Sequence, residues 1–319
     1  MQKRLAKSEK LDGKAMLLAV LAALVCAVPL RTVQLFTNIE PDTGFFAAID
    51  WTVYTVYGVL LFGTVVLLLL PMLSSRLPAS RPVIRKSYAL TVGGFFLAVG
   101  IAYDVLVCAM RISNTIANEL GRTELFALLF TNGLLALLLQ AVCGAAACVY
   151  FVFFALSYLK GNAVFCKYKL LGLMPLFWTL FRLVSRFMTK ISFTILSELL
   201  IELAMLSFMA LFMMSFARVS AGINQKGEMQ KCIRYGLPAA FLALTIGISR
   251  LVCTVGGNAE VLPDGFAFAL SDLGFGVFAV LYIFEHMQYG RPASEDAQLA
   301  AEADEPNENP ADTPKESEA

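Results

Sequence analysis

The sequence predicts an all-α, polytopic integral membrane protein, a bundle of about eight transmembrane helices with both termini in the cytoplasm. Hydrophobic residues make up 58% of the 319 residues and charged residues only 15%. A soluble globular domain usually has about a quarter charged residues. Apolar runs long enough to cross about 30 Å of hydrocarbon also recur along the chain. These two observations exclude a soluble enzyme.

Eight apolar segments are expected to form the helices of this bundle. Each reaches or nearly reaches the roughly 20 residues that an α-helix needs to cross a bilayer. Runs such as Val65 to Leu70 do not alternate polar and apolar residues, as the strands of a membrane β-barrel would. The expected spans are 15–36, 51–73, 88–110, 132–159, 169–188, 197–217, 236–255 and 266–286.

Basic residues predict the orientation of the bundle. Lysine and arginine gather before the first span and in the loops after the second, fourth and sixth spans. The loops 37–50 and 256–265 contain acids and no base. Because basic loops stay in the cytoplasm, we expect a multi-pass protein of the cell membrane with both termini inside.

Three regions follow from this arrangement. A basic cytoplasmic N-terminus covers residues 1–14, the transmembrane domain covers 15–287, and an acidic cytoplasmic tail covers 288–319. Residues 291–319 hold nine acids, two bases and no aromatic residue, so the tail is expected to be disordered. The formal net charge of +1 therefore hides a basic body and an acidic tail.

The motifs of several catalytic and cofactor-binding classes do not occur in the sequence. It contains no HExxH, GxxxxGK[ST], GxSxG, GxGxxG or CxxC pattern, and His286 is its single histidine. We therefore expect no enzyme activity, no cofactor, no metal site and no nucleic-acid partner. The expected partners are the lipid bilayer and, under one interpretation below, a small polar solute.

Ionisable residues inside the spans form the informative pattern. A charge in hydrocarbon costs several kcal/mol unless it faces the bundle interior and finds a partner. Counting about 1.5 Å per residue from the cytoplasmic ends places six charges about 20 to 25 Å up, in the outer third of the membrane. They are Arg31, Asp104, Arg182, Glu202, Arg250 and Asp272.

Hairpin geometry predicts partners for these charges. In an antiparallel hairpin, residues at equal depth have a constant number sum, so Arg182 is expected opposite Glu202. Arg186 and Glu198 give the same sum and extend this into a two-rung ladder. By the same reasoning Arg250 is expected to face Asp272. Arg31 and Asp104 would then pair with each other or be hydrated by water.

Arginines near the outer end of every upward span form a second pattern. Arg31, Arg111, Arg182 and Arg250 lie 80, 71 and 68 residues apart, about one hairpin each. Tandem duplication of a hairpin would produce such a repeat. The sequence similarity around the four arginines is too short to establish a duplication.

Two interpretations of the charged layer remain open. In the first, it lines an outward-facing cavity that binds or transports a small polar or anionic solute. In the second, the charges are structural salt bridges of a membrane scaffold or sensor. The candidate substrate-binding residues are Arg31, Asp104, Arg182, Arg186, Glu198, Glu202, Arg250 and Asp272.

Overall fold

The computed structural model describes residues 2–37, 51–73, 85–119, 129, 133–162, 164–188, 196–222, 227–256, 262 and 267–290. These residues form helices and no strand, which confirms the all-α prediction. Eight helices within the described ranges are long and apolar enough to cross a membrane. The predictions for the loop 38–50 and for the tail after residue 290 lie outside the described residues.

The helices follow the predicted order along the chain. The α-helices are α1 (Gln2–Thr37), α2 (Trp51–Leu73), α3 (Tyr88–Glu119), α5 (Leu134–Lys160), α6 (Met174–Met188), α7 (Leu196–Ser220), α8 (Glu228–Val255) and α9 (Leu270–Tyr289). Two short 3-10 helices, η1 (Val164–Lys167) and η2 (Leu171–Leu173), precede α6.

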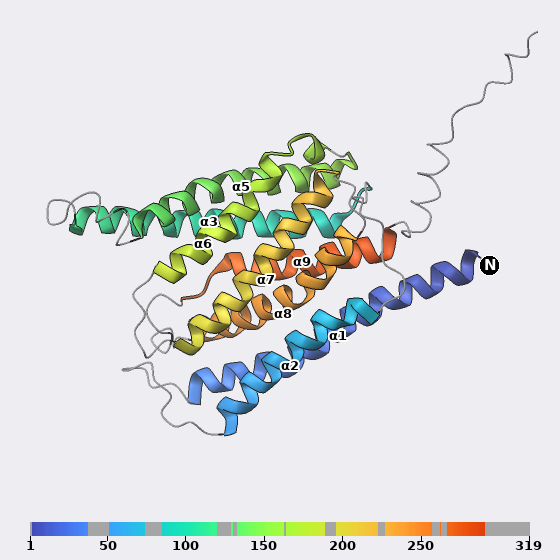
Figure 1. Ribbon diagram of the computed structural model, residues 1–319, viewed down its shortest axis with the longest axis horizontal. Coiled ribbons are helices and arrows are strands. Elements are labelled where there is room, and N and C mark those ends of the chain that lie inside the picture. The colour runs from blue at the N-terminus through green and yellow to red at the C-terminus, as the bar shows by residue number, and fades with distance from the viewer. Residues whose placement is uncertain are drawn as a thin grey trace, which may run out of the picture.

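Helices α8 and α9 form the centre of the bundle (Figure 1). The hairpin of α1 and α2 packs on α8 at one side, and the hairpin of α3 and α5 packs on α9 at the other. Helix α7 packs against α8 and α6. Most residues of α7, α8 and α9 are therefore buried, whereas α1 and α2 leave most of their surface exposed.

Aromatic rings fill the space between the central helices. Phe151 of α5, Phe216 of α7 and Phe278 of α9 are all fully buried. The ring centres of Phe151 and Phe278 lie 5.1 Å apart, and those of Phe216 and Phe278 lie 5.7 Å apart. Both pairs meet edge to face, the arrangement that the charge distribution of aromatic rings favours.

Three helices extend by eight or more residues beyond the predicted spans, and the first of them, α1, begins at Gln2 instead of residue 15. Helix α3 continues to Glu119 instead of ending at residue 110, and α8 begins at Glu228 instead of residue 236. Apolar runs mark the limits of the hydrocarbon, but polar residues continue a helix as readily as apolar ones. Glu228 is also buried between Arg218 at 3.2 Å and Lys231 at 2.9 Å, which stabilises the first turn of α8.

Helix α6 is shorter than its predicted span of 169–188. Its 15 residues rise about 22 Å at 1.5 Å per residue, and the preceding residues form η2 instead of continuing the α-helix.

Helix α1 begins and α9 ends at the same end of the bundle (Figure 1). An even number of crossings requires this arrangement.

Candidate functional site

Seven ion-paired side chains cross the bundle near the end away from the start of α1, and we call them the ion-pair network. Arg31 of α1 pairs with Glu198 of α7 and also contacts Gln34. Glu198 lies 3.6 Å from Arg250 of α8, which in turn lies 3.2 Å from Glu202 of α7. The first half of the network thus joins α1, α7 and α8.

The second half of the network joins α7 to α6 and α9. Glu202 Oε1 accepts a hydrogen bond from Arg186 Nε at 2.8 Å and lies 3.9 Å from Arg182 Nη2. Arg182 holds Asp272 with both guanidinium nitrogens, at 2.6 and 3.0 Å. Its Nη1 also donates to Ser271 at 3.1 Å. Asp272 lies in the first turn of α9, where the helix dipole favours a negative charge.

Water reaches little of this network. Glu202 is fully buried, and Arg31, Arg182, Arg250 and Asp272 are each at most 3% exposed. Buried charges are tolerated only when partners replace the water that they lose. Four arginines share three carboxylates here, and Glu202 alone contacts three arginines. The network therefore fixes how α1, α6, α7, α8 and α9 fit together.

The predicted ladder is present only in part. Arg182 and Glu202 meet at 3.9 Å, but Arg186 pairs with Glu202 one turn away from its expected partner Glu198. Glu198 is held by Arg31 and Arg250 instead. The number-sum rule considers one hairpin alone, whereas α8 and α1 bring further arginines to the same face of α7.

The other two predicted pairings are wrong. Arg250 pairs with the glutamates of α7, and Asp272 pairs with Arg182 of α6. Arg31 lies on α1, which packs against α8 and α9 on the side away from α3, so its partner is Glu198 and not Asp104. Arg250 of α8, for example, pairs with Glu202 of α7 and not with Asp272 on the next helix, α9.

Asp104 of α3 is held separately from the network. Its Oδ2 accepts hydrogen bonds from Trp178 Nε1 at 2.9 Å and from Gln140 Nε2 at 3.0 Å. The Ser185 hydroxyl donates to Gln140 Oε1 at 3.0 Å and thereby fixes the orientation of the amide. Three helices, α3, α5 and α6, thus position one carboxylate.

Glycines permit the close contacts around Asp104. A Cβ added at Gly144 would lie 2.8 Å from Val105 and 3.0 Å from Trp178, so only glycine lets Trp178 approach α3 there. A Cβ at Gly100 would lie 2.8 Å from the carbonyl oxygen of Leu270. Gly100 therefore brings the start of α9 against α3, close to Asp104.

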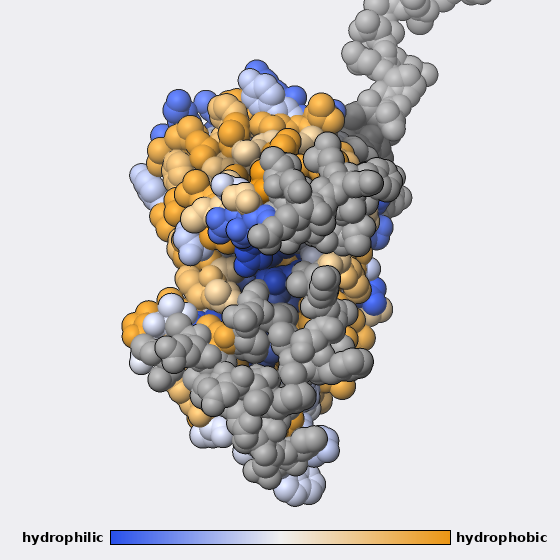
Figure 2. All heavy atoms as spheres, turned by 90° about the vertical axis from the view of Figure 1, so that its left-hand side faces the viewer, coloured by the Kyte–Doolittle hydropathy of each residue, from blue (hydrophilic) through white to orange (hydrophobic). Residues whose placement is uncertain are grey.

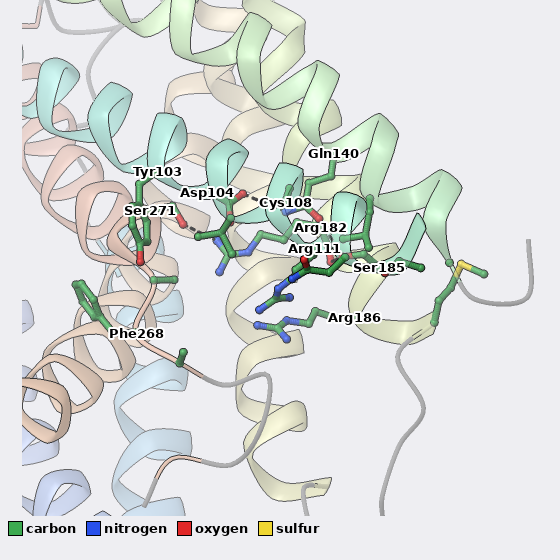
Figure 3. Close-up of a pocket in the computed structure, with 18 of the residues that line it drawn as sticks. Tyr103, Asp104, Cys108, Arg111, Gln140, Arg182, Ser185, Arg186, Phe268 and Ser271 are labelled. Carbon is green, nitrogen blue, oxygen red and sulfur yellow. Dashed lines mark hydrogen bonds between the residues drawn. The ribbon is translucent and has the colours of Figure 1, made fainter. Parts of the chain in front are cut away.

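A polar pocket of about 650 Å³ lies between α3, α5, α6 and the residues before α9. This volume is typical of small-molecule sites. Of the eight candidate residues, Asp104, Arg182 and Arg186 line the pocket, and the other five lie in the ion-pair network instead. Figure 3 shows how Asp104, Arg182 and Arg186 face this space from α3 and α6.

Hydrophilic residues are visible at this end of the bundle. Figure 2 looks onto it from the left of Figure 1 and shows hydrophilic side chains at the centre, flanked by hydrophobic surface. The pocket itself is lined by a mixture of charged, amide, hydroxyl and apolar side chains. A small molecule with polar ends would find partners for them here.

Arg111 adds a further positive charge to the pocket. It lies on α3, is exposed, and extends into the same space as Arg186 (Figure 3). Both guanidinium groups line the same pocket, where their like charges repel each other. Among the described residues, no acid forms an ion pair with Arg111. The pocket thus presents an arginine whose charge is not neutralised within the described part of the chain.

Several residues of the site were not among the candidates from sequence. Arg111 follows Asp104 by seven residues, so both lie on one face of α3, and this spacing is readable in the sequence. Ser185 lies one turn after Arg182 in the same way. The contact of Trp178 with Asp104 had no such signal, because α3 and α6 are distant in sequence.

Comparison with protein-family models, with curated proteins and with solved structures finds no match to this chain.

Proposed function

We propose that this protein binds a small anionic solute in the polar pocket, as a multi-pass protein of the cell membrane. The observation that carries the proposal is Arg111, an arginine without an acidic partner among the described residues, beside Arg186 in a pocket of about 650 Å³. Paired guanidinium groups are the usual partners of carboxylates and phosphates in proteins.

The charge balance of the whole layer supports an anionic ligand. Its described members are five arginines, including Arg111, and four carboxylates, so one positive charge is in excess. A positive excess in a partly desolvated pocket attracts anions and strengthens each contact beyond its value in water. One bound anion would neutralise the layer.

The expected orientation places this pocket on the outer side of the membrane. The basic loops and the N-terminal segment favour cytoplasmic termini. The pocket is lined by the last turns of α3 and α6 and the first residues of α5 and α9, and these lie at the end of the bundle away from the start of α1. The solute would then enter from outside. Arginine is disfavoured on that side, so its presence there favours a role beyond orientation.

Ligand-dependent thermal stability tests the proposal. The purified full chain in detergent is heated with acetate, hexanoate, inorganic phosphate or sulfate at matched ionic strength. A binding anion raises the melting temperature, because a ligand that binds only the folded state stabilises it. Arg111→Gln should remove most of that shift. Arg85→Gln, which removes the same charge from an exposed residue before α3, should leave it unchanged.

Uptake measurements then separate a carrier from a receptor. Cells that express the chain should accumulate the radiolabelled ligand if the protein carries it, and Arg111→Gln should abolish this. Stabilisation without uptake would identify a receptor. No stabilisation by any of the four anions would contradict the proposal.

A non-transporting scaffold is the second candidate, and the buried ion-pair network favours it. Glu202 is fully buried and holds three arginines, which is the arrangement expected of a structural element. For a scaffold, charge-changing substitutions would alter folding alone, and no small anion would change the melting temperature.

A further inference from the structure

The geometry points to an amphoteric ligand, a small molecule with an acidic group for Arg111 and Arg186 and an ammonium group for Asp104. This inference rests on the proposed anion site and deepens it, because it assigns a second charged end to the same solute. Asp104 lines the pocket together with both arginines, so one molecule would contact all three side chains.

The described residues use only one oxygen of Asp104. Trp178 and Gln140 both donate to Oδ2, at 2.9 and 3.0 Å. Among the described residues, no donor forms a hydrogen bond with Oδ1. Asp104 is only partly buried and faces the pocket (Figure 3), so Oδ1 is available to a ligand.

The carboxylate is held by groups that have little freedom to move. Trp178 is fully buried and Gln140 is 4% exposed. The Ser185 hydroxyl lies 3.0 Å from Gln140 Oε1 and 2.9 Å from the carbonyl oxygen of Arg182, and its single hydrogen can be donated to either oxygen. A site with charged groups oriented before binding loses less entropy when the ligand arrives.

The spacing along α3 sets the form of the ligand. Asp104 and Arg111 are seven residues apart, which is a rise of about 10 Å along one helix face. Val107 and Leu137 line the pocket too and provide apolar contacts. A ligand with an ammonium and an acid at opposite ends of a short aliphatic chain fits this arrangement.

A matched series of six-carbon acids tests the inference on the full chain in detergent. Hexanoate, 6-hydroxyhexanoate and 6-aminohexanoate share the acidic end and differ only at the other end. Isothermal titration should give 6-aminohexanoate at least a tenfold lower Kd than hexanoate, because only its ammonium group pairs with Asp104. Equal affinity for all three acids, or equal affinity for the hydroxy and amino acids, would overturn the ammonium assignment.

Substitution at Asp104 provides the second arm of the test. Asp104→Asn should raise the Kd of 6-aminohexanoate about tenfold and leave that of hexanoate unchanged. Asp104→Glu, which keeps the charge, should keep the preference for the amino acid. If either variant does not fold, the ligand series on the unmodified chain still decides.

The two proposals fail in different ways. Suppose that hexanoate binds as tightly as 6-aminohexanoate and that Arg111→Gln abolishes the binding of both. This result would support the anion site and contradict the ammonium contact with Asp104. Binding by none of the three acids, together with no stabilisation by phosphate or sulfate, contradicts the anion site itself.

Discussion

The ion-pair network and the polar pocket use the same residue types at the same end of the bundle, yet they differ in how each charge is neutralised. In the network, every carboxylate contacts at least one arginine, and Glu202 contacts three. In the pocket, Asp104 is held by neutral donors and Arg111 has no acidic partner among the described residues.

This difference separates structural charges from charges that suit binding. A guanidinium that already holds a carboxylate bidentately, as Arg182 holds Asp272, has little to offer a ligand. Arg111, and the Asp104 oxygen that no described donor contacts, can still bind a ligand. Position in the membrane alone therefore does not distinguish Asp104 and Arg111 from the network, whereas their partners among the described residues do.

The largest effect is expected for Glu202→Gln. It leaves Arg182, Arg186 and Arg250 with one carboxylate fewer in a buried site, so the free energy of unfolding should fall by about 3 to 5 kcal/mol. Thermal unfolding of the purified protein measures this. Glu228→Gln is the matched control, since Glu228 is equally buried but its partners Arg218 and Lys231 are 38% and 48% exposed.

That control should lose about 1 kcal/mol or less, because exposed ion pairs contribute little. Equal losses for the two glutamine variants would show that the network is no more structural than an ordinary surface pair.

The next effect concerns Arg31 and Glu198, the pair that attaches α1 to α7. Arg31→Met or Glu198→Leu alone should cost about 2 to 4 kcal/mol, because each leaves a buried charge with fewer partners. The double variant removes both charges and should cost less than the two single losses together, by about 0.5 to 3 kcal/mol. A double-mutant cycle on thermal unfolding measures this coupling, and additive losses would mean that the two side chains act independently.

Gly144→Ala should have an intermediate effect on stability and a clear effect on the pocket. The new methyl group would overlap Val105 and Trp178, which costs about 1 to 3 kcal/mol in a packed site. Displacement of Trp178 would also disturb Asp104. Gly58→Ala is the control, since nothing lies within 4 Å of a Cβ there. Binding of 6-aminohexanoate should weaken in Gly144→Ala only.

The smallest effect on stability is expected for Arg111→Gln. Because Arg111 is exposed and forms no ion pair with a described acid, the free energy of unfolding should change by less than about 0.5 kcal/mol. Thermal unfolding without ligand measures this. A loss as large as that of Glu202→Gln would place Arg111 in the structural class and weaken its assignment to a ligand.

The sequence predicted the helices better than it predicted their contacts. Apolar runs identify all eight helices, because a helix that crosses a membrane needs a long stretch of apolar side chains. Counting residues from the cytoplasmic ends of the spans also predicted that the charged residues lie near one end of the bundle. The prediction misplaced the start of α1, the end of α3 and the start of α8, where polar residues continue the helix outside the apolar run.

Partners and pocket depend on helix packing, which the sequence alone does not specify. The equal-depth rule assumes that consecutive helices are the nearest neighbours, but Asp272 meets Arg182 on α6 and not Arg250 on the preceding helix. Arg186 likewise reaches one turn past its expected level to Glu202. The pocket arises where α3, α5 and α6 meet the start of α9, and no local sequence pattern signals such a junction.

Thiol labelling tests the central contrast between pocket and network most directly. Val107→Cys places a thiol in the pocket between Asp104 and Arg111, while the native Cys253 lies fully buried one turn from Arg250. Intact cells that express the variant are treated with a charged, membrane-impermeant maleimide, and the labelled peptides are identified by mass spectrometry. We expect labelling at position 107 from outside and none at Cys253. Equal labelling of both thiols, or protection of position 107, would contradict a water-filled outer pocket beside a dry ion-pair network.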